Sequence, residues 1–306
     1  MRTPVLFLAA ALLLAGSAAR AQSVWTGGGA DPRWSAAANW QGGTAPVPSP
    51  LTSLTFGGSV SNAQSDFLTG SAFSNLTFAA GAAPFTLSGN GFGLYGALVN
   101  SSSSQQRIAA DLTWTGKNRS LDTGAAGIVL DGAFTCGATD AYFVKNGAGV
   151  LTLNGGGTFT AADFNYINSV NAGTVVITKD ITFNRLDLQN GARLIVTNNA
   201  TLSGFTGNYV FWQQATVDLY SGKINVQSSL LTAQDWTKTC TVNVRGGQFV
   251  GNGNMRWCNN GNVLLNISGD GEFQWLAGNQ LAENGGCWLT IDRKSTRLNS
   301  SHDQIS

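Results

Sequence analysis

The most regular feature of the chain is a short phrase in which apolar, polar and apolar residues alternate and a turn follows. Its polar centre falls at positions 187, 218, 243, 266 and 290, which gives steps of 31, 25, 23 and 24 residues. A phrase that returns with such a period is typical of repeat proteins, in which each stacked coil contacts mainly its neighbours. The copies in the second half are Leu186-Asp187-Leu188, Val217-Asp218-Leu219, Val242-Asn243-Val244, Leu265-Asn266-Ile267 and Leu289-Thr290-Ile291.

The first half carries the same phrase at Leu54-Thr55-Phe56, Leu76-Thr77-Phe78 and Leu151-Thr152-Leu153, and a variant with valine at the polar centre at Ile128-Val129-Leu130. The alternation indicates strands whose apolar side chains point inward, and the glycines that follow suit turns with positive φ or close backbone approach. A β-sandwich also alternates, but a fixed period favours stacking. We therefore predict an all-β fold, a right-handed parallel β-helix or β-solenoid with coils of about 23–25 residues, over residues 51–292.

The two ends differ from the repeats. Residues 1–21 have the charge, the short apolar run and the Ala-x-Ala site of a secretory signal peptide, so we expect the mature chain to begin at Gln22. Residues 22–50 form a Trp/Pro-rich N-terminal cap, whose tryptophans suit either a core or a sugar-stacking platform. Residues 293–306 lose the register and resemble a translated sequencing adapter, which predicts a fragment of a longer protein.

Composition narrows the functional classes. The chain has 39 glycines and a formal net charge of +1, and residues 22–292 alone carry −3. No basic face stands out, so we expect no nucleic-acid partner. The only histidine, His302, lies in the expected tail, which argues against serine–histidine nucleophilic chemistry. After the signal peptide, no segment is apolar for long enough to predict a membrane span.

The four cysteines, Cys136, Cys240, Cys258 and Cys287, have no CxxC spacing. An exported chain permits disulfides, and a bridge between Cys240 and Cys258 on successive coils is plausible, although three pairings are possible. A zinc site would need all four thiolates to converge.

One stretch carries a family resemblance. Lys145-Asn146-Gly147-Ala148-Gly149-Val150-Leu151-Thr152-Leu153-Asn154-Gly155 is followed by Thr158-Phe159-Thr160 and by Asn171-Ala172-Gly173-Thr174-Val175. Residues 144–178 thereby resemble the autotransporter-associated β-strand repeat, although Phe159 stands where tyrosine is usual and residues 161–166 replace the Gly-Gly-Thr turn. The resemblance implies an exported β-helix passenger. It transfers no catalytic residue, because the repeat has none.

The sharpest candidate for chemistry is an outward column of polar side chains. Two carboxylates one coil apart would raise each other's pKa, bind calcium or act together on a glycosidic bond. The alternative is a solvated ladder of hydrogen-bonding side chains. Asp270-Gly271-Glu272 is a second acidic segment, interpreted as a solvated turn. The column comprises Asp187, Asp218, Asn243, Asn266 and Thr290.

We assign no catalytic, cofactor-binding or metal-binding residue. The leading hypothesis is a non-enzymatic structural or passenger region of a secreted or cell-surface protein, exported by a bacterial route, in adhesion or surface presentation. Surface glycans or a neighbouring cell surface are the expected partners. The first alternative is a polysaccharide lyase or glycoside hydrolase, for which Arg185, Arg193 and Lys223 lie near the acidic column. The second is a carbohydrate-binding module. The fold alone does not choose among them.

Overall fold

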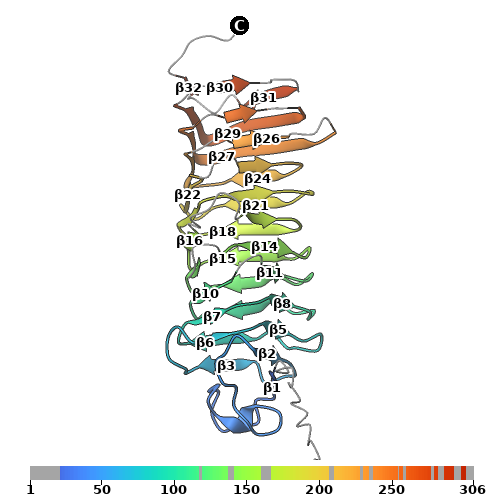
Figure 1. Ribbon diagram of the computed structural model, residues 1–306. Coiled ribbons are helices and arrows are strands. Elements are labelled where there is room, and N and C mark those ends of the chain that lie inside the picture. The colour runs from blue at the N-terminus through green and yellow to red at the C-terminus, as the bar shows by residue number, and fades with distance from the viewer. Residues whose placement is uncertain are drawn as a thin grey trace, which may run out of the picture.

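The chain forms a column of parallel strands stacked coil upon coil, with β1 (Ala21–Trp25) and β2 (Thr52–Phe56) at one end and the strands β30 (Asn279–Leu281), β31 (Cys287–Ile291) and β32 (Leu298–Ser300) at the other (Figure 1). The computed structural model describes residues 21–116, 119–136, 141–159, 167–206, 210–227, 230–233, 237–253, 255–257, 260–276, 279–281, 286–292 and 298–300. Within these ranges the only helix is the 3₁₀ turn η1 (Ala37–Asn39). The predicted fold class, a parallel β-solenoid, is confirmed.

Each coil contributes three strands, and like strands of successive coils pair in parallel to make three faces. The first face is a sheet of β1 (Ala21–Trp25), β2 (Thr52–Phe56), β5 (Leu76–Phe78), β8 (Leu98–Asn100), β11 (Arg119–Asp122), β14 (Phe143–Asn146), β17 (Asn168–Val170), β20 (Leu186–Leu188), β23 (Val210–Trp212), β26 (Leu230–Thr232), β28 (Met255–Trp257) and β30 (Asn279–Leu281).

The second and third faces are joined, because β27 (Thr239–Gly251) and β29 (Asn262–Trp275) run through both of them. The second face holds β3 (Asn62–Ser65), β6 (Thr86–Gly89), β9 (Gln106–Ile108), β12 (Ile128–Leu130), β15 (Val150–Leu153), β18 (Thr174–Ile177), β21 (Arg193–Val196), β24 (Thr216–Leu219) and β31 (Cys287–Ile291). The third holds β4 (Ala72–Phe73), β7 (Phe92–Leu94), β10 (Leu112–Trp114), β13 (Phe134–Cys136), β16 (Gly157–Phe159), β19 (Ile181–Phe183), β22 (Thr201–Gly204), β25 (Lys223–Val226) and β32 (Leu298–Ser300).

Inward side chains at equivalent positions of successive coils are similar, pack on one another along the column and form one continuous core. On the first face Leu54, Leu76 and Leu98 pair in register and are fully buried. On the third face the rings of Phe159 and Phe183 stack with centroids 5.0 Å apart. Each such side chain stabilises the fold by about 1.5–3 kcal/mol through removal of apolar surface from water.

Glycine is required where two coils approach closely at a corner. Gly155 follows β15 with ordinary backbone angles, and a Cβ atom built on it would collide with the carbonyl oxygen of Gly132 in the coil below. Gly222 is required for two reasons. Its φ is +87°, in the left-handed region, and a Cβ atom built on it would collide with the carbonyl oxygen of Ala200. The predicted role of the turn glycines is confirmed at these positions.

Candidate functional site

The prediction that Asp187 belongs to the acidic column is wrong. Asp187 lies on β20 of the first face, where its in-register neighbour is Ser169. Asp218 lies on β24 of the second face, between Ile195 below and Asn243 above. The two carboxylates therefore lie on different faces and form no acid pair. The 31-residue step between them is a change of face rather than one long coil.

The remaining members of the column are confirmed. Asp218, Asn243, Asn266 and Thr290 pair in register on successive coils. Their side chains bond along the stack: the Asn243 amide donates to Asp218 Oδ1 at 2.9 Å, and the Asn266 amide donates to Asn243 Oδ1 at 2.8 Å. This is the ladder of hydrogen-bonding side chains that the sequence offered as the alternative, except that Asp218 and Asn243 are buried rather than solvated.

Asp218 is the anchor of this ladder. Its side chain is 1% exposed, and it accepts a bond from Arg193 Nε at 2.7 Å and pairs with Arg245 Nη1 at 2.9 Å. Arg193 comes from the coil below and Arg245 from the coil above, so the carboxylate ties three coils together. The bond to Asp218 raises the pKa of Arg193. Both carboxylate oxygens of Asp218 are therefore occupied by cationic partners.

Arg245 has a second contact on the same face. Its guanidinium lies over the Tyr220 ring, 5.0 Å from the centroid, and its Nη1 donates to the Tyr220 hydroxyl at 2.6 Å. Both side chains remain about two-fifths exposed. The outer surface of the second face therefore presents an arginine–tyrosine pair immediately above the Asp218 anchor.

Asp187 has a separate set of partners on the first face. Arg185 donates to it through Nε at 3.0 Å and Nη2 at 2.7 Å, and the backbone N–H of Phe211 donates at 3.0 Å. Burial raises the pKa of Asp187, while the bonds from Arg185 and Phe211 oppose that rise. The Arg185 guanidinium also lies over the Phe211 ring at 4.8 Å. This arrangement is a shielded ion pair that braces neighbouring coils.

A buried lysine is the polar site that sequence reasoning missed. Lys145 occupies an inward position of β14, in register between Leu121 and Val170, and is fully buried. Its ammonium donates to the Thr123 hydroxyl at 3.0 Å and to four carbonyl oxygens at 2.7–3.2 Å, those of Asn146, Gly147, Gly149 and Ala172. Burial lowers its pKa to about 8, and the attraction of Asp122 opposes that shift.

The signal for this site lies in the alternation itself. Within β14 the pattern places position 145 on the inward side, where the stacked positions above and below are aliphatic. A lysine at such a position must find acceptors for its three donors. The glycine-rich turn after β14 supplies them, because its carbonyl groups face the corner between the first and second faces.

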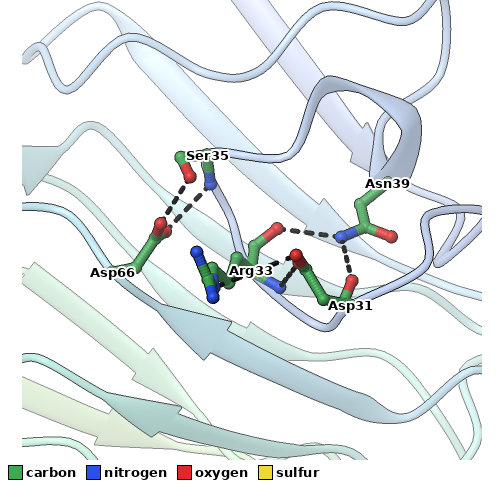
Figure 2. Close-up of polar contacts among 5 residues, drawn as sticks. All are labelled: Asp31, Arg33, Ser35, Asn39 and Asp66. Atoms are coloured by element: carbon green, nitrogen blue, oxygen red, sulfur yellow. Dashed lines mark hydrogen bonds and ion pairs between the residues drawn. The ribbon is translucent and has the colours of Figure 1, made fainter.

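The N-terminal cap is held by one buried amide. Figure 2 shows the Asn39 side chain, whose Nδ2 donates to the backbone oxygens of Asp31 and Arg33 at 2.7 and 2.8 Å. Its Oδ1 accepts the N–H of Gly29 at 2.8 Å. Nearby, Asp66 accepts the N–H of Ser35 at 2.9 Å and also its hydroxyl, which fastens the cap to the coil above.

The cap tryptophans belong to the core. Trp25, Trp34 and Trp40 are at most 2% exposed. Trp34 packs against Phe56 and Phe73 with ring centroids 5.5 and 5.9 Å apart. The core interpretation is confirmed and the sugar-stacking platform is wrong, because a sugar cannot reach ring faces that are already covered.

The second acidic segment is part of a strand. Asp270 and Glu272 lie within β29, where the register against β27 shifts as the strand bends from the second face to the third. Gln248 on the coil below donates to Glu272 Oε2 at 2.8 Å. The predicted solvated turn is therefore a bent, paired strand, in which Asp270 is exposed and Glu272 is half-buried.

The cysteines provide no cross-link at the expected place. Cys240 is a fully buried free thiol, so the expected bridge to Cys258 is not formed, and Cys258 itself lies outside the described residues. Cys240, Val263 and Cys287 occupy one column on successive coils. Burial raises the pKa values of Cys136 and Cys240 to about 12.

The part of the chain that the structure describes contains no group of three or more histidine, cysteine or acidic side chains placed to hold a metal ion. Within the same residues, no helix has the length and apolar character needed to cross a bilayer.

A polar groove of about 550 Å³ opens at the corner between the second and third faces. It is lined by Asn154, Thr178, Lys179, Asp180, Asn198, Asn199 and Ala200.

Comparison of the chain with protein-family models, with curated proteins and with solved structures finds no significant match. Functional inference therefore depends on the residues and on the solenoid itself.

Proposed function

We propose that this chain is a rigid, non-enzymatic passenger region of an exported protein, which acts at or outside the cell surface in presentation or adhesion. The observation that carries the proposal is the in-register stacking of outward polar side chains across coils. Asp218 joins three coils through Arg193 and Arg245, and Asn243 and Asn266 continue the ladder. These carboxylate and amide groups are used to hold the column together.

A stack of this kind is suited to holding another part of the protein away from the cell surface, because its length grows with each coil while its cross-section stays constant. Adjacent strands are about 4.8 Å apart, so every coil raises the next one by that amount. Residues far along the chain are thereby held at a fixed distance from the first coil. The resemblance of residues 144–178 to autotransporter-associated repeats supports the same role, and the leader-like residues 1–21 support export.

Export can be tested with the full chain in a Gram-negative host, with a short epitope inserted after Thr69. Leu68, its neighbour, is 85% exposed in a loop, so the insertion disturbs no ladder. We expect the protein outside the cytoplasm, with Gln22 as its first residue by N-terminal sequencing. Retention in the cytoplasm with the leader intact would overturn the proposal.

The non-enzymatic part is tested separately on purified protein. Galacturonan, alginate and xylan are incubated with the protein, with and without calcium, and new reducing or unsaturated ends are measured. We expect no cleavage above a buffer control. If cleavage occurs and is lost on heating the protein, the chain is an enzyme and this part of the proposal is wrong.

A further inference from the structure

The corner groove exists because one coil has a longer corner than the coil below it. Ile177 pairs with Val196 on the second face, and Ile181 pairs with Leu202 on the third. The lower coil crosses the corner in four steps along the chain and the upper coil in six. The two extra residues make the upper corner overhang the lower one.

The overhanging corner is held in an unusual conformation. Asn198 and Asn199 are consecutive residues with φ of 57° and 59°, in the left-handed region that asparagine tolerates better than most residues. Asn198 Nδ2 donates to the Thr178 oxygen at 3.1 Å, and the Asn199 N–H donates to the Ser221 hydroxyl at 3.0 Å. Strained backbone that its surroundings hold in place is found most often at functional sites.

The rim of the groove has unused hydrogen-bonding capacity, unlike the ladder around Asp218. Among the described residues, the Lys179 ammonium has no ion pair or hydrogen bond with the protein, and the Asn199 side chain has no partner. Asp180 uses Oδ1 for the N–H of Thr201 at 2.7 Å. Asn154, on the floor, is already occupied by Asp131 and Thr178.

We propose that this groove binds a carboxylated sugar unit of an acidic polysaccharide. The inference rests on the proposed role in adhesion and gives that role a ligand class. Lys179 supplies a cation for the sugar carboxylate, since a charge-assisted bond is the strongest single contact available there. The amides of Asn198 and Asn199 and the carboxylate of Asp180 match ring hydroxyls, which both donate and accept.

The geometry favours a sugar chain over an acidic peptide. The groove offers one cation beside several neutral amide groups, whereas an acidic peptide would be better matched by clustered arginines. The corner also continues along the column axis, because Val196, which lies just before the groove, is in register with Leu219 on the next coil and Leu219 with Val244 on the one above. An extended polymer can follow that line.

The test is calorimetric titration of the purified full chain with the tetramers of galacturonic and mannuronic acid. Methyl-esterified tetragalacturonate and cellotetraose, which lack the carboxylates, serve as uncharged probes. We expect binding of at least one acidic tetramer and none of the uncharged ones. Lys179→Gln should lower the affinity for the acidic tetramer about tenfold or more. Asn199→Gly, which keeps the left-handed backbone, should also lower that affinity.

Lys238→Gln is the matched control, because it removes one positive charge at the start of β27, away from the groove. Unchanged affinity in this variant together with a loss in Lys179→Gln supports the site. Equal losses in both variants, equal binding of oligoglutamate, or no binding of either acidic tetramer at millimolar concentration would overturn it. The titration uses purified protein, so its failure is distinguishable from a failure of export.

Discussion

The Lys145 ammonium lies 3.0 Å from the Thr123 hydroxyl on the preceding coil, inside a corner that is otherwise closed by backbone carbonyl groups. A charged side chain thus replaces an aliphatic one in the inward column without leaving its donors unpaired. The site is specific to this coil, because the stacked positions below and above are Leu121 and Val170.

Lys145→Met tests whether the ammonium stabilises the corner. Methionine has a similar length but no donors, so the carbonyl groups of Gly147 and Ala172 lose the bonds from Lys145, while those of Asn146 and Gly149 keep bonds from Thr123. Because unsatisfied buried polar groups cost about 1–3 kcal/mol each and the corner can relax in part, we expect the free energy of unfolding to fall by about 3 kcal/mol. Urea denaturation measures the change. Lys238→Met, a partly exposed lysine, should shift the midpoint little, and equal shifts would contradict the assigned role.

Gly155→Ala tests how closely two coils approach. The backbone of Gly155 is accessible to any residue, so the substitution adds only a methyl group, which would meet the Gly132 carbonyl oxygen. We expect destabilisation by about 3 kcal/mol, since backbone cannot move aside as a flexible side chain can. Gly81→Ala is the matched control, because no atom lies within 4 Å of its added Cβ. Thermal unfolding of the two variants should differ clearly.

Asp218→Ala tests the anchor of the outer ladder. The variant leaves Arg193 and Arg245 without their shared carboxylate, and Asn243 without its acceptor. The arginines are about two-fifths exposed and can turn to solvent, so we expect a loss of about 2 kcal/mol rather than the larger cost of a fully buried unpaired charge. Chemical denaturation beside the exposed-site control Asp270→Ala measures it; a result equal to the control would show that the ladder contributes nothing.

The buried thiol of Cys240 should make the free energy of unfolding fall at alkaline pH. Burial raises the pKa of its thiol from 9.0 to about 12, so between these values the unfolded chain releases a proton that the folded chain keeps. Stability from this group is therefore fully present below pH 9 and falls as the pH rises toward 12. At pH 10 the expected loss is about 1 kcal/mol.

The measurement compares urea midpoints at pH 8 and pH 10 for the wild type and for Cys240→Ala. Other titrating groups are common to both proteins and cancel. The variant starts less stable because a buried side chain is truncated, but its midpoint should depend less on pH. The same pH dependence in both proteins would contradict the prediction.

The sequence predicted the stacking but not which face each phrase occupies. Apolar–polar–apolar alternation marks a strand with one side buried, and every coil has three such strands. The period alone therefore could not separate Asp187 on the first face from Asp218 on the second. The steps near one coil length, from Asp218 through Asn243 and Asn266, were correct because those strands do lie on one face.

The groove could not be predicted because it depends on a difference between coils. Asn198 and Asn199 look like ordinary turn residues in the sequence. Only the register of Val196 and Leu202 against the coil below shows two extra corner residues. The burial of the cap tryptophans could be predicted, because large aromatic side chains are needed to cover the exposed core at the end of a stack.

The direction of the bonds between coils has a mechanical consequence. In a parallel stack they run along the column axis, so a pull on the two ends loads them in tension, and one coil can peel away while the rest stay paired. Each coil released would lengthen the chain by about 80 Å at full extension. A sideways load is instead shared by three faces at once. The column should therefore yield to stretching in small regular steps and resist bending, as a tether that absorbs sudden force without detaching would require.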